Sequence, residues 1–144
     1  MRQELAPLLR GAKRRYRDGI EWYGLDGMVV VVGGIGAAPA RRAAQLAIDD
    51  MHPEILVSAG TAGALVRELK VGDVILPQEV VDAGTGERFA AGGTNGVLVT
   101  ASAVSGAPEK RELARHFAAQ AVDMEAAAVA QVAQAAGIVF RAFK

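Results

Sequence analysis

Two carboxylates flank a methionine in the segment Asp123-Met124-Glu125, which lies between a short apolar stretch and an alanine-rich segment with helical spacing. Carboxylates in the first turn of a helix are favoured by the helix dipole, so capping is the ordinary interpretation. Capping explains Asp123 well and Met124 poorly. A carboxylate at the junction of a strand and a helix can also accept two hydrogen bonds from a vicinal diol. This segment is therefore a candidate site for a sugar.

Two glycine-rich turns offer a second kind of chemistry, in Gly33-Gly34-Ile35-Gly36 and Gly60-Thr61-Ala62-Gly63. Each follows an apolar, strand-like run, so its backbone N–H groups can approach an anion or a ribose. A dinucleotide site needs G-x-G-x-x-G and an acidic residue about 20 positions later. Here Pro39 takes the place of the third glycine, and the next strand ends at Ser58. The dinucleotide interpretation is weak, but two such turns on neighbouring strands predict one shared pocket.

The other chemically capable side chains have ordinary explanations when taken one at a time. Glu4 is expected to be a solvated acid in the first turn of a helix, and the histidines His52 and His116 are expected to serve packing or the surface. The basic cluster 13–17 is interpreted as a solvated loop. With two histidines and no cysteine, the sequence predicts no metal site.

These residues depend on elements that can be predicted from apolar periodicity and turn signals. We expect helices over 1–10, 39–51, 108–117 and 123–136, and strands over 20–23, 28–32, 55–57, 74–76, 79–83, 97–100, 121–122 and 138–143. The run 28–32, the helix 39–51 and the run 55–57 form one βαβ unit in this interpretation. Residues 84–96, with five glycines, are expected to form a loop or hairpin. The pattern is that of one α/β domain over 1–144.

Composition excludes several classes of protein. The chain has 144 residues, 51% of them hydrophobic, with 16 basic and 16 acidic side chains. A balanced charge and few aromatic residues argue against a nucleic-acid partner. The longest strongly apolar run, 28–32, is too short to span a membrane, and the N-terminus has no signal-peptide core. We expect a cytoplasmic protein with no membrane partner.

In combination and in order, the motifs resemble the purine nucleoside phosphorylase and nucleosidase superfamily, most of all its methylthioadenosine/S-adenosylhomocysteine nucleosidases. The resemblance covers residue 28 to the end and rests on four segments: 33–36, 58–65 (SAGTAGAL), 69–75 (LKVGDVI) and 121–128 (AVDMEAAA). The segments 69–75 and 121–128 are specific to this superfamily, whereas the two segments with glycine turns are not. The fold that this resemblance implies is a three-layer α/β/α arrangement with a mixed, mostly parallel central sheet.

The resemblance also implies an activity, which is cleavage of the N-glycosidic bond of a purine (adenine) nucleoside through an oxocarbenium-like transition state, without a metal or organic cofactor. An oxocarbenium centre needs nearby negative charge, and a water nucleophile needs a base. The implied catalytic residues are Glu125, on the ribose hydroxyls, and Glu4, which would activate water. The implied substrate-binding residues are Gly36, Thr61, Ala62, Gly63, Val104, Asp123, Met124 and Glu125.

Three departures from the family pattern bear on these expectations. The family's general acid is an aspartate in a Ser-Asp pair just beyond the strand that ends here at Lys144. The family also begins with a strand before the equivalent of Met1, so we expect a domain incomplete at both ends. Val104 takes the place of a phenylalanine that stacks on adenine in the nucleosidases, which leaves the identity of the base open.

Hydrolysis is favoured over phosphorolysis on the evidence of one position. Hexameric bacterial phosphorylases carry a phosphate-binding arginine where this chain has Ser58. A buried phosphate without a cation is costly. Arg41 or an arginine of a partner subunit can still serve, so a phosphorylase with phosphate as co-substrate is one alternative. A catalytically inactive nucleoside-binding or structural homologue is another. The family commonly pairs its subunits, and unpaired strand edges favour association, so a homo-oligomer, a dimer, is expected.

Overall fold

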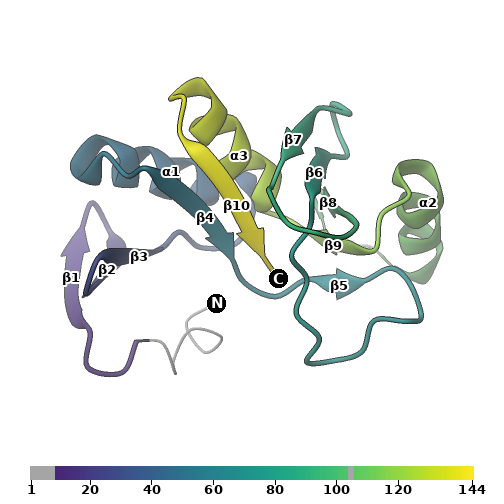
Figure 1. Ribbon diagram of the computed structural model, residues 1–144, viewed down its shortest axis with the longest axis horizontal. Helices are drawn as coiled ribbons and strands as arrows, with labels where there is room; N and C mark the ends of the chain where they lie inside the picture. Colours follow the sequence, from purple (N-terminus) through teal and green to yellow (C-terminus); the bar gives the residue numbers. More distant parts are fainter. Residues whose placement is uncertain (1–8, 104–105) are drawn as a thin grey trace.

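The computed structural model describes residues 9–103 and 106–144 (Figure 1). Glu4 and Val104 lie outside the described residues, as does most of the helix expected over 1–10. The helices are α1 (Ala37–Met51), α2 (Ala107–Phe117) and α3 (Ala126–Ala135). The strands are β1 (Lys13–Arg17), β2 (Ile20–Leu25), β3 (Met28–Val32), β4 (Ile55–Ala59), β5 (Gly63–Ala64), β6 (Glu79–Asp82), β7 (Arg88–Ala90), β8 (Val97–Thr100), β9 (Ala121–Asp123) and β10 (Val139–Phe143).

The first three strands form an antiparallel sheet in the order β1-β2-β3. Tight turns at Asp18-Gly19 and Asp26-Gly27 join them, and both glycines have positive φ. The basic cluster 13–17 is therefore strand β1 and not the loop that the sequence suggested. All five of its side chains are exposed, as expected, because its partner β2 buries Ile20 and Trp22 against α1 while β1 covers only an edge.

A second sheet contains β4 and β10, which run parallel with Ser58 opposite Ala142. The βαβ interpretation expected β3 to join the same sheet as β4. In the structure β3 pairs with β2, and β4 pairs with β10. Helix α1 still packs on both regions, since Ala43 and Ala47 share a cluster with Val31 and Leu56. The two strands and the helix of this unit were thus predicted correctly. The pairing of the strands was not, because the hydrophobic pattern of a strand does not specify its neighbour.

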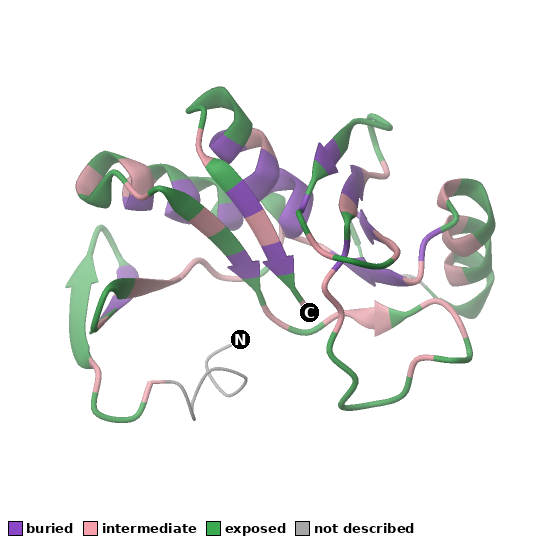
Figure 2. Ribbon diagram, in the orientation of Figure 1, coloured by how far each residue is buried: buried purple, intermediate pink, exposed green. Residues whose placement is uncertain are grey.

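The third sheet is mixed, with the order β5-β9-β8-β6-β7. Its central strands β9, β8 and β6 are parallel, and its outer strands β5 and β7 are antiparallel to their neighbours. Alternate side chains of β8 face opposite layers: Leu98 packs in the cluster that contains α3, and Val99 in the cluster that contains Leu113 of α2. Figure 2 shows the buried residues concentrated on α3 and this sheet. The expected α/β class with a mixed sheet is confirmed, although the strands are divided among three sheets.

The segment between β5 and β6 has no regular strand at 74–76, where one was expected. Ile75 instead exchanges two backbone hydrogen bonds with Lys144, at N···O distances of 2.6 and 3.0 Å. This contact secures the segment beside the end of β10. Within the described residues, no helix is long and apolar enough to cross a membrane.

Candidate functional site

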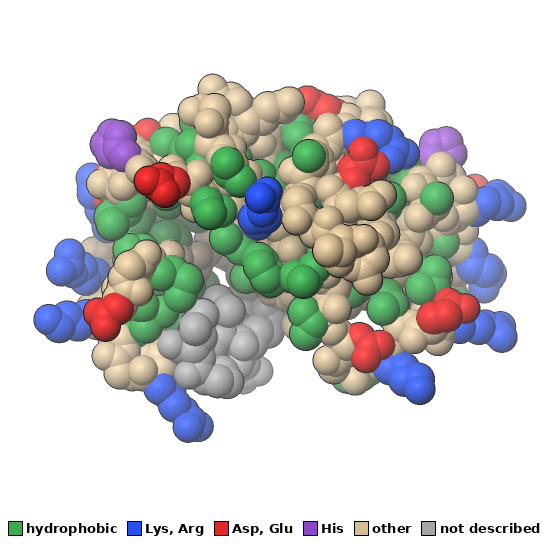
Figure 3. Space-filling model, in the orientation of Figure 1, with side chains coloured by type: hydrophobic (Ala, Val, Ile, Leu, Met, Phe, Trp, Pro, Cys, Tyr) green, Lys and Arg blue, Asp and Glu red, His purple; other side chains and the backbone are tan. Residues whose placement is uncertain are grey.

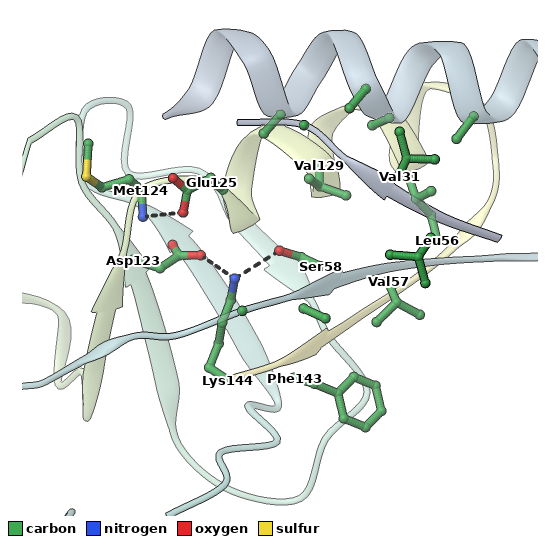
Figure 4. A pocket seen from close by; sticks show the side chains of 18 of the residues that line it. Val31, Leu56, Val57, Ser58, Asp123, Met124, Glu125, Val129, Phe143 and Lys144 are labelled. Carbon is green, nitrogen blue, oxygen red and sulfur yellow. Dashed lines mark hydrogen bonds and ion pairs between the residues drawn. The ribbon is translucent and has the colours of Figure 1, made fainter. Parts of the chain in front are cut away.

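One cavity of about 1250 Å³ extends along β3, β4 and α1 to the carboxyl ends of β3, β4, β9 and β10 (Figure 4). Both glycine turns reach it, with residues 33–35 from the first and 60–63 from the second. The segment 123–125 lines it as well. The expectation of one pocket shared by the two turns is therefore correct. The two turns meet because α1 packs against both β3 and β4, although these strands belong to different sheets.

Glu125 stands at the entrance to α3, half-buried, with its carboxylate held by two backbone donors. Its Oε1 accepts a hydrogen bond from the N–H of Gly36 at 2.7 Å, and its Oε2 accepts one from the N–H of Met124 at 3.2 Å. An ionised carboxylate has about four lone-pair sites, so further donors can be accommodated. The carboxylate is oriented and still able to receive two hydroxyl groups from the cavity.

Gly36, at the end of the first glycine turn, holds Glu125 through its backbone N–H. Its φ of 92° and ψ of 170° belong to a region that only glycine adopts readily. Gly36 was expected to bind substrate, whereas the structure commits its N–H to Glu125. Nearby, Gly33 allows α1 to approach β3, because a Cβ there would lie 3.0 Å from the Cβ of Ala43.

Asp123 is completely buried and fully engaged. Its Oδ1 accepts a hydrogen bond from Thr100 Oγ1 at 2.6 Å, and its Oδ2 accepts one from the N–H of Ala126 at 2.9 Å. The capping interpretation of Asp123 is therefore correct. Thr100 Oγ1 in turn accepts the N–H of Ala127 at 3.0 Å. The pair anchors the first turn of α3 on β8 and β9, and it places Glu125 at the cavity.

Sequence reasoning missed Lys144, which follows β10. Its ammonium lies 2.9 Å from Asp123 Oδ2 and donates a hydrogen bond to Ser58 Oγ at 3.1 Å. Figure 4 shows this side chain reaching from β10 to both partners. The sequence predicted no cation at Ser58. In the structure the Lys144 ammonium lies beside Ser58, but its charge is neutralised by Asp123. No local pattern signals this role, because the three residues meet only through the pairing of distant strands.

Lys110 was missed as well, since in sequence it belongs to a charged helix. It reaches the cavity from α2 and lies beside Gly63, which pairs with Val122. A Cβ built on Gly63 would lie 3.2 Å from the Lys110 ammonium. Thr61, Ala62 and Gly63 line the cavity as expected, together with Met124.

Two remaining expectations concern cations. Arg41, considered as a phosphate ligand, donates a hydrogen bond to Gln131 at 2.6 Å on the exposed surface and does not line the cavity. Among the residues that the structure describes, no group of three acidic, histidine or cysteine side chains is arranged to hold a metal ion. The charged groups of the described cavity are therefore two carboxylates and two lysines.

The sequence was compared with models of known protein families. The model of the phosphorylase superfamily matches residues 13–98 and 94–144. The match covers most of the chain and includes both glycine turns and the segment 121–128. The chain belongs to the phosphorylase superfamily.

The chain is also similar to individual proteins and solved structures. The 5′-methylthioadenosine/S-adenosylhomocysteine nucleosidase of Geobacillus kaustophilus is 36% identical over 59 residues, which is 40% of this chain and 25% of that protein. The match thus spans about a quarter of the length of this curated relative. The nucleosidase of the same name from Neisseria meningitidis, solved with methylthio-immucillin-A, has a TM-score of 0.88 and 26% identity over 99% of this chain and 80% of its own. A futalosine hydrolase from Helicobacter pylori shares the fold, with a TM-score of 0.85 and 20% identity over 100% of this chain and 84% of its own.

Proposed function

We propose that this protein binds a purine nucleoside such as methylthioadenosine and hydrolyses its N-glycosidic bond. The observation that carries the proposal is the Glu125 carboxylate, oriented by Gly36 at the mouth of a cavity that Thr61, Ala62 and Gly63 line on another side. Two ribose hydroxyls fit the remaining acceptor sites of this carboxylate. The names of the relatives from Geobacillus kaustophilus and Neisseria meningitidis support the reaction class.

In this proposal, Glu125 contributes in two ways. It holds the ribose, and its negative charge stabilises the positive charge that develops on the sugar as the glycosidic bond breaks. A charge fixed before the reaction costs no reorganisation in the transition state. Met124 supplies an apolar contact beside the sugar. Glu4, outside the described residues, is proposed as the base that activates water.

Hydrolysis remains the preferred variant over phosphorolysis. A phosphate dianion in the cavity needs a cation that is free to pair with it. At Ser58, the position of the phosphorylase arginine, the Lys144 ammonium is paired with Asp123, and Arg41 lies outside the cavity. Lys110 lines the cavity at Gly63 instead of at Ser58. Water needs no such partner. A phosphorylase therefore stays the second candidate, favoured by the family to which the chain belongs and by the presence of Lys110 in the cavity.

The test is release of adenine from methylthioadenosine, followed by chromatography with and without phosphate. Release without phosphate supports the hydrolase. Release that depends on phosphate overturns the hydrolytic proposal in favour of a phosphorylase. Absence of release in both buffers overturns both and leaves a nucleoside-binding or structural homologue, for which direct binding of the nucleoside is the remaining measurement.

We also propose that the chain forms a homodimer. Support comes from apolar side chains on one face of the β4–β10 pair, which Figure 3 shows across the middle of the molecule. Ile55, Val57, Val139 and Phe143 are each about half exposed. Burying them in an interface would stabilise a pair of subunits. Sedimentation at micromolar concentration is expected to give a dimer, and a monomer would contradict the proposal. The expected cytoplasmic location stays a prediction, which fractionation of the cells would test.

A further inference from the structure

The cavity continues from the candidate site into a slot between β3 and β4. This slot is lined by residues 28–31 of β3, by residues 55–59 of β4 and by four alanines of α1, which are Ala40, Ala43, Ala44 and Ala47. Successive residues of a strand point to opposite faces, so a cavity lined by consecutive residues runs along the edge of the strand and not across one face. The slot therefore lies against the edges of both strands.

Both edges carry backbone groups that have no strand partner in the described part of the chain. There β3 pairs only with β2, and β4 pairs only with β10. A backbone N–H or C=O group that is removed from water without a partner is costly, so an enclosed edge requires one. The slot thus combines apolar walls with rows of backbone donors and acceptors on two sides.

The two strands end at the same place in the molecule. The turn after β3 brings the N–H of Gly36 to Glu125. Near the end of β4, Ser58 accepts a hydrogen bond from Lys144, whose ammonium is paired with Asp123. Because Asp123 and Glu125 are two residues apart, the carboxyl ends of β3 and β4 meet at one end of the slot. The strands therefore run in the same direction along it.

A single extended strand fits between these edges. Helix α1 packs on both strands, since Val31 and Leu56 share a cluster with it, yet β3 and β4 do not pair. Figure 4 shows both side chains in the same part of the cavity. Each strand has five residues, so an inserted strand of the same length, about 17 Å, can pair along both edges. It would join the two sheets into one sheet of the order β1-β2-β3-insert-β4-β10.

We propose that this slot binds an extended apolar strand of another polypeptide. Backbone hydrogen bonds to the two edges supply affinity, and the apolar walls select aliphatic side chains on the face toward α1. A lipid chain would cover the apolar walls but leave the backbone groups of both edges unpaired. The inference goes beyond the proposed function, since neither the ribose site nor the reaction enters it.

The test uses a synthetic peptide of five alternating valine and isoleucine residues, flanked by lysines that keep it soluble. Calorimetry is expected to show one peptide bound per chain, and amide hydrogen exchange is expected to slow along β3 and β4. The same peptide with proline at its centre is expected to bind about tenfold more weakly, because proline cannot donate to the ladder. Absence of binding overturns the inference, as do equal binding of the two peptides and unchanged exchange at both strands.

A matched pair of variants tests the location of the peptide. Val57 and Val139 are each 46% exposed on the same face of the β4–β10 pair, and of the two only Val57 lines the slot. Val57→Lys is expected to weaken peptide binding about tenfold, because it places a charge beside an apolar strand. Val139→Lys is expected to leave binding unchanged, and equal losses in both variants contradict the proposed location.

Two further measurements separate the alternatives. Binding of dodecyl maltoside monomers without binding of the peptide assigns the slot to an alkyl chain and overturns the inference. Release of adenine from methylthioadenosine, measured without the peptide, tests the proposed function by itself. Peptide binding without adenine release supports the inference and defeats the proposed function, and adenine release without peptide binding does the reverse.

Discussion

The ammonium of Lys144 and the carboxylate of Asp123 form a buried ion pair that joins two sheets. The atoms lie 2.9 Å apart, and the side chains are 2% and 0% exposed. Asp123 ends β9 of the five-stranded sheet, and Lys144 follows β10 of the parallel pair. The same lysine donates to Ser58 on β4. This contact therefore fixes the two sheets relative to each other at the floor of the cavity.

Replacement of Lys144 by Met is expected to destabilise the fold strongly. The substitution leaves Asp123 as a buried carboxylate without a cation, and breaking a buried pair in this way costs about 3–5 kcal/mol. The free energy of unfolding in urea measures the loss. The double variant Lys144→Met with Asp123→Asn removes the uncompensated charge and keeps an oxygen for the N–H of Ala126, so most of the stability is expected to return. Equal stability of the single variant and the wild type would show that the pair contributes nothing.

Replacement of Glu125 by Gln is expected to weaken nucleoside binding far more than folding. The amide retains one oxygen for the Gly36 N–H, but it loses the charge and the second acceptor that the ribose hydroxyls need. We expect at least about a tenfold loss of affinity, because charge-assisted hydrogen bonds are the stronger kind. Calorimetry with methylthioadenosine and urea unfolding measure the two effects. Glu68→Gln, on the exposed surface, is the matched control. Unchanged affinity would remove Glu125 from the site.

Gly36→Ala is expected to strain the turn that holds Glu125. No atom obstructs a Cβ at this position, so the cost arises from the backbone conformation, about 1–3 kcal/mol. Both the stability and the nucleoside affinity are expected to fall, since relaxation of the turn moves the N–H that orients Glu125. Gly24→Ala in β2 has ordinary φ and open space, so it is expected to change neither. If the two variants behave alike in urea unfolding and in calorimetry, backbone strain at Gly36 is not important.

Trp22 is predicted to stabilise the fold through its size and not through its N–H. The indole Nε1 is buried and has no hydrogen-bond partner among the described residues. Trp22→Phe is expected to cost less than about 1.5 kcal/mol, because no paired donor is lost. Trp22→Ala removes packing against Ile20 and α1 and is expected to cost about 3–5 kcal/mol. Similar losses for both variants in urea unfolding would contradict this account.

Local signals in the sequence were sufficient for most elements of the fold. The apolar run at 28–32, the alanine spacing of α1 and the glycine turns depend on interactions within a few residues, so they can be read without a structure. The basic strand 13–17 was missed because its side chains are all solvated and carry no apolar alternation. The strand expected at 74–76 is absent for the opposite reason: the residues are apolar, but only Ile75 forms backbone hydrogen bonds with Lys144, and Val74 is exposed.

By itself, the sequence determined the α/β class, the two glycine turns that share a pocket, and the carboxylate segment 123–125. These follow from motifs whose parts are adjacent in the chain. Only the tertiary structure decided that β3 and β4 lie in different sheets, that Gly36 holds Glu125, and that Lys144 and Lys110 reach the cavity. The physical reason is that each of these contacts joins residues far apart in the chain. The residues next to a charged side chain in the sequence do not indicate which distant residue it will contact.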